Sequence, residues 1–344
     1  VTGPNAHNHT TLGDWHFEQP EENVVTIFEG IKDIGENYNH KVDYFDSGIK
    51  IRNIKDSRIK ATAEMSTNYD HVFVVVGDNS LRYTWEGGKS FQKTAGENKA
   101  RSFLGLPGKQ LDLVKSIYEK NKNLTVVYVS GKPISEPWIE DNIKSIIHAW
   151  EPGSMGGKSL AKIVFGEINP SGKMPMTTAR SVGQLTMVYN HKPTNYIHKY
   201  AFEKTKPLYR FGFGLSYTTF SISKPTLSTT KWDGTGKILV EVDVQNTGER
   251  EGMETVQLYI RDLFSSVTRP VLELKGYKKV NVFPGQTKRV SFSLELDDFA
   301  FYDREMKYKA EEGKFNILVG NSANSSKLKK TTIELTKNIY LNEN

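Results

Sequence analysis

Two unbroken apolar runs in the first half of the chain restrict the fold more than any other feature. The runs occupy positions 71–77 (HVFVVVG) and 124–129 (LTVVYV). A strand that is apolar at every position has to be covered on both faces, as strands are in a parallel sheet. Pro107-Gly108 opens a predicted helix between the two runs, with Leu111, Val114 and Tyr118 on one face. This alternation of strand and helix predicts an α/β fold, a mostly parallel α/β/α sandwich.

The rest of the first half follows the same pattern. Apolar residues at helical spacing begin at Val24, and a second helix is predicted around 59–68. A short strand is predicted at 41–45 and a buried strand at 145–150. A further helix follows through Leu160 and Val164.

From about residue 222 the periodicity changes to two. The segment 238–244 (ILVEVDV) alternates and is followed by a turn at 246–248. About seven short strands without helical periodicity predict an all-β sandwich of the immunoglobulin or fibronectin type. We therefore predict a sandwich domain at 1–205, an aromatic and glycine-rich connector at 206–222, and a β-sandwich at 223–344.

Composition excludes several classes of function. The 344 residues contain no cysteine, which removes disulfides and thiolate chemistry. The net charge of +6 is spread among 40 acidic residues, so we expect no nucleic-acid partner. No window reaches the roughly 20 apolar residues of a membrane span, so no membrane partner is expected. The eight histidines are dispersed, and we expect neither a metal nor a cofactor.

One glycine-rich segment imitates a phosphate-binding loop. Residues 153–159 (GSMGGKS) lie between a predicted strand and a predicted helix. A phosphate-binding loop needs four residues between its first glycine and the Gly-Lys pair, and here there are three. A glycine-rich helix start that allows close packing is the better interpretation.

A long polar loop, 78–105, follows the first apolar run. It carries the aromatic residues Tyr83 and Trp85 and the carboxylates Glu86 and Glu97. Functional groups gather at the carboxyl ends of parallel strands, and rings beside carboxylates suit sugar binding. Composition alone favours an ordinary surface loop.

Several motifs together resemble glycoside hydrolase family 3. They are 96–101 (GENKAR) with 106–108 (LPG), 150–157 (WEPGSMGG), 165–175 (FGEINPSGKMP), 180–184 (RSVGQ), and 209–217 (YRFGFGLSY). Segments 270–276, 284–285 and 313–315 resemble the fibronectin type III-like domain of that family. The resemblance covers nearly the whole chain.

The resemblance implies a fold, a mechanism and site residues. The family joins an N-terminal (β/α)8 barrel to an α/β sandwich, often with a fibronectin-like domain, and this chain corresponds to the last two. The nucleophile, an aspartate on the barrel, then has no counterpart here, and Asp14 does not match its position. Glu97 is the predicted general acid/base and Glu86 its rival, because other branches place that residue earlier in the loop. Tyr83 and Trp85 are predicted to stack on sugar, with core packing as the alternative.

The function implied by this resemblance is that of a retaining exo-β-glycosidase, foremost a β-glucosidase. Its expected partners are a β-linked oligosaccharide or aryl or alkyl β-glycoside, and a barrel domain in the same chain or in a separate one. The implied location is periplasmic or secreted. The alternative is a non-catalytic sugar-binding or scaffolding chain, since one carboxyl without its nucleophile cannot carry out double displacement.

Overall fold

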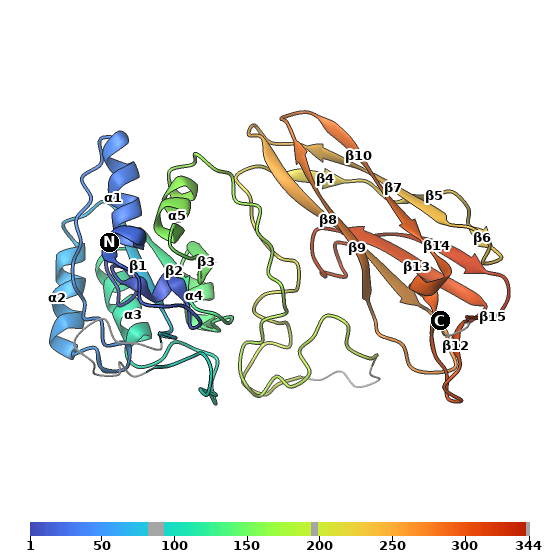
Figure 1. Ribbon diagram of the computed structural model, residues 1–344, viewed down its shortest axis with the longest axis horizontal. Coiled ribbons are helices and arrows are strands. Elements are labelled where there is room, and N and C mark those ends of the chain that lie inside the picture. The colour runs from blue at the N-terminus through green and yellow to red at the C-terminus, as the bar shows by residue number, and fades with distance from the viewer. Residues whose placement is uncertain (82–92, 194–198, 342–344) are drawn as a thin grey trace. The chain divides into compact units, whose positions relative to one another are not determined.

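The computed structural model describes residues 1–81, 93–193 and 199–341. These residues form two compact units (Figure 1). Unit 1 comprises Val1–Ile168 and Arg180–Gln184, and unit 2 comprises Asn169–Ala179 and Leu185–Asn344. The predicted domain bounds at 205 and 222 stay a prediction.

Unit 1 is built on a parallel sheet in the order β1-β2-β3. The strands are β1 (Val72–Gly77), β2 (Leu124–Val129) and β3 (Ser145–Trp150), and the helices are α1 (Ile27–Asn37), α2 (Asp56–Ser66), α3 (Gln110–Lys120), α4 (Pro137–Asn142) and α5 (Gly156–Val164). Short 3₁₀ helices occur at His9–Leu12, Glu21–Asn23 and Ile51–Asn53. Both runs are strands, as predicted, and they pair directly with each other.

The sheet of unit 1 is covered on both faces. Val74 and Val126 are fully buried in a core with residues of α2, α3 and α4. Val75 and Val127 are fully buried in a second core with residues of α1 and α5. Alternate residues of one strand therefore enter different cores, which explains why the runs are apolar throughout. The predicted α/β/α sandwich is confirmed.

Local chemistry explains where α1 begins and how closely it packs. Thr26 caps the helix, its hydroxyl accepting the N–H of Glu29 while the Glu29 carboxylate accepts the N–H of Thr26. Helix α5 then packs directly on α1 through two glycines. A Cβ built on Gly30 would lie 2.2 Å from the Gly157 carbonyl carbon, and one built on Gly157 would lie 1.9 Å from the Thr26 oxygen. The segment 153–159 is therefore a close-packing helix start.

Two local predictions differ from the structure. The strand expected at 41–45 is wrong, because only Phe45 pairs, in an isolated bridge to Thr2. The segment around Thr2 pairs with this stretch at one residue, and a ladder of strands needs at least two consecutive pairs. Helix α4 was not predicted, because it has six residues and buries only Ile139, too little to show a period.

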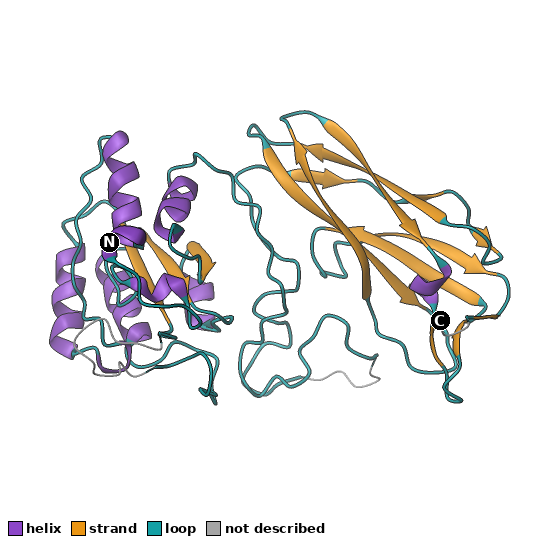
Figure 2. Ribbon diagram, viewed as in Figure 1, coloured by secondary structure: helices purple, strands orange, loops and turns teal. Residues whose placement is uncertain are grey.

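Unit 2 is an antiparallel β-sandwich (Figure 2). One sheet has the order β10-β7-β4 with β5 also on β7, a second has the order β6-β14-β13-β8-β9, in which β6 pairs parallel to β14, and β11-β12-β15 form a third. The strands are β4 (Phe220–Ile222), β5 (Thr226–Leu227), β6 (Lys231–Trp232), β7 (Ile238–Asn246), β8 (Gly252–Asp262), β9 (Glu273–Val282), β10 (Thr287–Leu294), β11 (Phe301–Tyr302), β12 (Tyr308–Ala310), β13 (Gly313–Gly320), β14 (Lys329–Leu335) and β15 (Ile339–Tyr340), with a 3₁₀ helix at Leu296–Phe299. Alternate residues of β7, from Ile238 to Val244, enter one core. The predicted all-β sandwich is confirmed.

The segment predicted as a connector makes specific contacts within unit 2. Tyr209 is buried and bridges Thr178, and the N–H of Gly212 donates to the Met174 oxygen. Gly212 also has a positive φ of 77°, and a Cβ there would lie 2.3 Å from the Gln257 side chain. Only glycine suits this approach to β8.

Candidate active site

The carboxyl ends of β1, β2 and β3 present three polar residues on neighbouring strands. Asp78 follows β1, Ser130 follows β2 and Glu151 follows β3. Gly77 makes the turn out of β1 possible, because its φ is +155° and a Cβ would lie 1.8 Å from the Val129 oxygen. This edge is where open α/β sheets carry their functional groups.

Asp78 is the centre of a buried polar network at this edge. Its Oδ1 accepts hydrogen bonds from the Thr94 hydroxyl (2.9 Å) and the Arg101 guanidinium (2.5 Å). Its Oδ2 accepts from the Ser130 hydroxyl (2.8 Å) and the Lys132 ammonium (2.9 Å). The Asp78 and Arg101 side chains are only 1% and 8% exposed, whereas Lys132 is 30% exposed, so the pair with Arg101 is the one withdrawn from bulk water. Four donors match the four acceptor positions of a carboxylate.

Two cations, Arg101 and Lys132, lie beside the Asp78 carboxylate. Arg101 is itself buried, at 8% side-chain exposure, and it also donates to the Gly105 oxygen and stacks over Phe103. Burial lowers the pKa of the Lys132 ammonium, and the Asp78 carboxylate opposes that effect. The Asp78 carboxylate therefore favours the charged form of Lys132.

The same network closes the loop that carries Glu97. Thr94 and Arg101 both donate to Asp78, and residues 94–101, called the arch below, connect these two points. The N–H of Thr94 also donates to the Asn79 oxygen (2.8 Å). Glu97 lies in the middle of the arch and is exposed. The arch therefore presents a carboxyl group to the surface from a backbone that is fixed at both ends.

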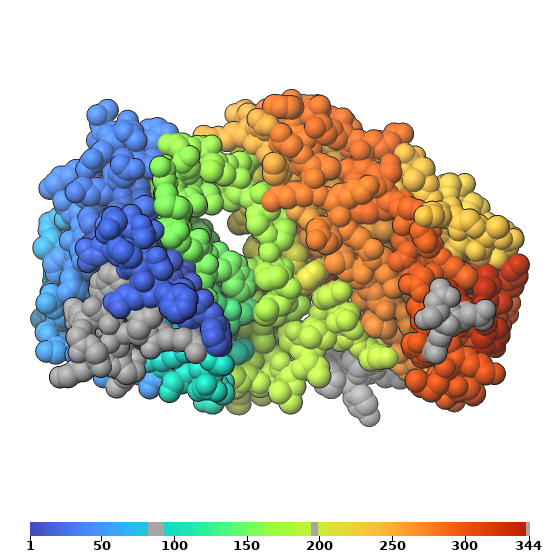
Figure 3. Space-filling model, in the orientation of Figure 1, coloured from blue at the N-terminus to red at the C-terminus, as the bar shows by residue number. Residues whose placement is uncertain are grey.

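A second contact holds the arch at its middle. The N–H of Glu97 donates to Asp14 Oδ2 (2.6 Å), and the Lys93 ammonium donates to Asp14 Oδ1 (2.8 Å) and to the Glu97 oxygen (3.4 Å). Asp14 belongs to the N-terminal segment, which is drawn in dark blue at the surface of unit 1 in Figure 3. Trp15 and Phe17 follow it and are 77% and 88% exposed.

Two further carboxyl groups lie close to this edge. Glu151 Oε1 accepts from the Ser80 hydroxyl (2.6 Å), and its carboxylate lies against Gly13 and Gly131, where a Cβ would come within 3.0 Å. Glu136 accepts the N–H of Leu106 (2.6 Å), and burial raises its pKa. Both carboxylates accept a hydrogen bond from a nearby donor.

The structure brings some predicted residues together and leaves others outside. Glu97 and Arg101 lie on one arch, as their spacing suggested. Tyr83, Trp85 and Glu86 lie outside the described residues. No group of three or more histidine and carboxylate residues able to hold a metal occurs in the described part of the chain. No helix among those residues is both long and apolar enough to cross a membrane.

Sequence reasoning assigned no role to Asp78, Lys132 or Asp14. The position of Asp78 directly after a buried strand was the signal that could have identified it. Nothing in the sequence relates Asp14 to Glu97, because 83 residues separate them.

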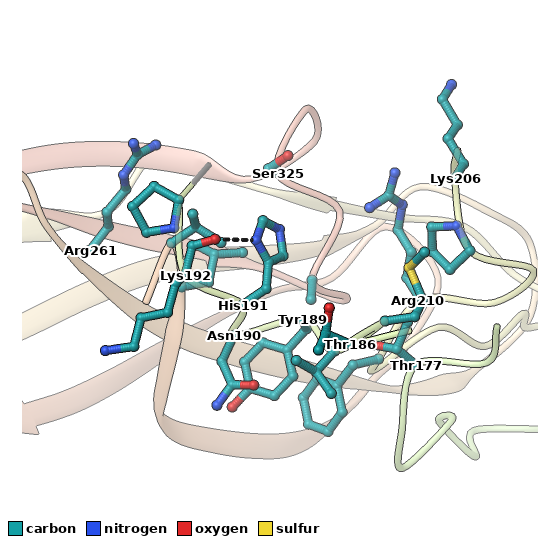
Figure 4. A pocket seen from close by; sticks show the side chains of 18 of the residues that line it. Thr177, Thr186, Tyr189, Asn190, His191, Lys192, Lys206, Arg210, Arg261 and Ser325 are labelled. Carbon is teal, nitrogen blue, oxygen red and sulfur yellow. Dashed lines mark hydrogen bonds between the residues drawn. The ribbon is translucent and has the colours of Figure 1, made fainter. Parts of the chain in front are cut away.

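A large cavity lies in unit 2. Its volume is about 1090 Å³, and its lining includes Tyr189, His191, Arg210, Phe211 and Arg261 (Figure 4). Glu97, the one predicted site residue among those that the structure describes, does not line it. The candidate site therefore remains the arch of unit 1.

Comparison with known proteins identifies the family. Residues 1–217 match the glycosyl hydrolase family 3 C-terminal domain, and residues 254–323 match the fibronectin type III-like domain. A periplasmic β-glucosidase of Salmonella typhimurium is 33% identical over 97% of this chain and 46% of its own length. A β-xylosidase of Formosa agariphila is 36% identical over 98% of this chain and 45% of its own length.

Solved structures agree with these relatives. A β-glucosidase from Erythrobacter marinus matches 98% of this chain and 46% of its own, with a TM-score of 0.84 and 31% identity. A β-glucosidase from Listeria innocua, in complex with isofagomine, matches 97% of this chain and 46% of its own, with a TM-score of 0.87 and 25% identity. The chain thus spans about half the length of these relatives. With a family model over most of its length and relatives matched almost from end to end, this chain belongs to glycoside hydrolase family 3.

Proposed function

We propose that this chain is the part of a retaining exo-β-glycosidase that supplies the general acid/base, with Glu97 in that role. The observation that carries the proposal is the arch, which holds the backbone of Glu97 at the carboxyl edge of a parallel sheet and leaves its side chain exposed. Glu86 remains the rival, and Tyr83 and Trp85 remain proposed sugar-stacking residues.

The proposed reaction is a double displacement. A nucleophilic carboxylate attacks the anomeric carbon while Glu97 donates its proton to the leaving oxygen. Glu97 then takes a proton from the water that hydrolyses the glycosyl-enzyme. The two carboxyl groups have to lie about 5 to 5.5 Å apart for this outcome. We propose that the nucleophile is an aspartate of a (β/α)8 barrel, in the same chain or in a separate one.

The relatives support the substrate class. Those reported above are named β-glucosidase and β-xylosidase, so we propose a nonreducing-end β-glucoside as the foremost substrate. The periplasmic relative supports a periplasmic or secreted location. Cell fractionation followed by an activity assay tests that location.

The test of Glu97 uses the protein with its barrel. Glu97→Gln should lower kcat/KM on a methyl or unsubstituted phenyl β-glucoside by about 100-fold or more, the usual contribution of a positioned acid. On a 2,4-dinitrophenyl β-glucoside, whose leaving group needs no proton, the kcat/KM of Glu97→Gln should fall far less. Azide should restore turnover to Glu97→Ala and give the β-glycosyl azide. The control is Glu119→Gln, an exposed carboxylate on α3.

Two results would contradict this assignment. Full turnover of the methyl glucoside by Glu97→Gln, together with its loss in Glu86→Gln, would transfer the role to Glu86. If the intact mass of the native protein shows the 344-residue chain with no barrel attached or co-purified, and it binds sugar without hydrolysis, the non-catalytic alternative holds.

A further inference from the structure

Asp14 and Lys93 form a largely buried ion pair that binds both backbone polar groups of Glu97. The two side chains are 2.8 Å apart and only 11% and 15% exposed. Together they bind the N–H and the carbonyl oxygen of Glu97. We call this pair the clasp. Most surface ion pairs connect side chains alone, so a pair that engages the backbone of one residue restricts its orientation directly.

The backbone of the arch is shaped to admit the clasp. Gly96 has a φ of +92°, and a Cβ there would lie 2.7 Å from Asp14 Oδ2 and 2.9 Å from the Lys93 Cε. Any other residue at 96 would therefore strain the backbone and displace the carboxylate. Asn98 also has a positive φ, of 60°, so Glu97 lies between two left-handed residues.

The clasp is in turn fixed to the rest of unit 1. The Arg52 guanidinium donates to the Lys93 oxygen (2.7 Å), and Thr94, the next residue, donates to Asp78. Lys93 is therefore held on its backbone as well as through its ammonium. A carboxylate and a cation that are both largely withdrawn from water interact more strongly than an exposed pair.

We infer that Asp14 is a positioning residue, which orients the Glu97 carboxyl for proton transfer by holding its peptide through the clasp. This inference rests on the proposed role of Glu97. Proton transfer requires the donor to reach the leaving oxygen within about 2.6 to 3.2 Å, so a small displacement of the peptide has a large effect. Asp14 touches neither substrate nor reacting atoms in this role. It acts through Glu97.

The inference predicts a specific kinetic pattern in the barrel-containing protein. Asp14→Ala should lower kcat/KM for the methyl β-glucoside by about 10- to 100-fold, the scale of a misplaced catalytic group. The loss on the 2,4-dinitrophenyl glucoside should be at most about 3-fold, because its departure needs no acid. Gly96→Ala should give the same pattern by forcing the clasp open. Asp14→Asn, which keeps an oxygen for the Glu97 N–H, should be intermediate.

A matched control separates positioning from general destabilisation. Asp56 forms an ion pair of 2.5 Å with Lys109, but its side chain is 80% exposed, so Asp56→Ala should leave both substrates unaffected. The melting temperature of each variant is measured alongside. If Asp14→Ala lowers activity equally on both glucosides, the clasp is merely structural and the inference is wrong.

The design distinguishes failure of this inference from failure of the proposed function. If Glu97→Gln abolishes turnover of the methyl glucoside while Asp14→Ala and Gly96→Ala do not affect it, only the clasp is refuted. If Glu97→Gln itself has no effect, the role of Glu97 and the inference are both refuted.

Discussion

Replacing Asp78 by asparagine removes one negative charge from the centre of the network at the strand ends. The carboxylate accepts four side-chain hydrogen bonds and interacts with two cations, Arg101 and Lys132. In the variant the new amide N–H₂ has to face at least one former donor. The buried Arg101 guanidinium, 8% exposed, would then have no anion beside it in this network.

The magnitude follows from burial. Removing one partner of a buried ion pair costs about 3 to 5 kcal/mol, because the remaining charge stays desolvated. Lys132 is 30% exposed and can be solvated in the variant, so it contributes less to this loss of stability. We therefore expect the free energy of unfolding of unit 1 to fall by about 3 to 5 kcal/mol.

Urea unfolding followed by circular dichroism at 222 nm measures this change. Within the described residues all five α-helices belong to unit 1, so the helical signal reports on that unit. With an m-value of about 2 kcal/mol/M, the midpoint should move down by about 1.5 to 2.5 M. Asp56→Asn, which changes an exposed pair, serves as the control.

A loss of less than about 1 kcal/mol, similar to that of the control, would refute the reasoning. It would mean that the interactions of Asp78 contribute no more to the free energy of unfolding than those of a surface carboxylate do. Restoration of stability in the double variant with Arg101→Met would support the reasoning, because it removes the unpaired buried charge.

Two further predictions concern unit 1. Gly157→Ala should lower the free energy of unfolding of unit 1 by about 1 to 3 kcal/mol or more, because the new methyl group would meet the Thr26 oxygen at 1.9 Å. The measurement is the urea midpoint, which should fall relative to that of Gly172→Ala, where nothing lies within 4 Å of the added Cβ. Burial lowers the pKa of His148 from 6.5 to about 4. As the pH falls, the unfolded state therefore binds a proton at this histidine before the folded state does. The free energy of unfolding should fall by up to about 3 kcal/mol as the pH drops from 6.5 to 4. His148→Phe should flatten this part of the pH profile, and an unchanged slope between pH 6.5 and 4 would contradict the assignment.

Helices and strands with a long apolar pattern were predictable because burial leaves a period in the sequence. Val72–Gly77 is apolar throughout and Leu124–Val129 is apolar except at Thr125, since each strand contributes residues to two cores. The predicted strand at 41–45 failed because strand formation needs a pairing partner, and a pattern in one segment does not reveal whether its neighbour offers one.

Part of the candidate site was also predictable. The family resemblance of residues 96–101 singled out the segment that carries Glu97 and Arg101, and the strand-end rule pointed to the loop that contains it. The donors that surround Asp78 come from two separate segments: Thr94 and Arg101 from the arch, Ser130 and Lys132 from the turn after β2. Their convergence depends on the order of the strands, which local sequence does not specify.

The sequence by itself determined that this chain forms a covered parallel sheet followed by a β-sandwich, because the spacing of apolar side chains is set by which faces have to be buried. Only the tertiary structure decided what holds Glu97 in place. Asp14 lies 83 residues before it, and the two meet because the N-terminal segment and the arch are brought to the same edge of one sheet. A hydrogen bond of 2.6 Å between such distant residues leaves no periodic trace in the sequence, since one carboxylate and one backbone N–H suffice to make it.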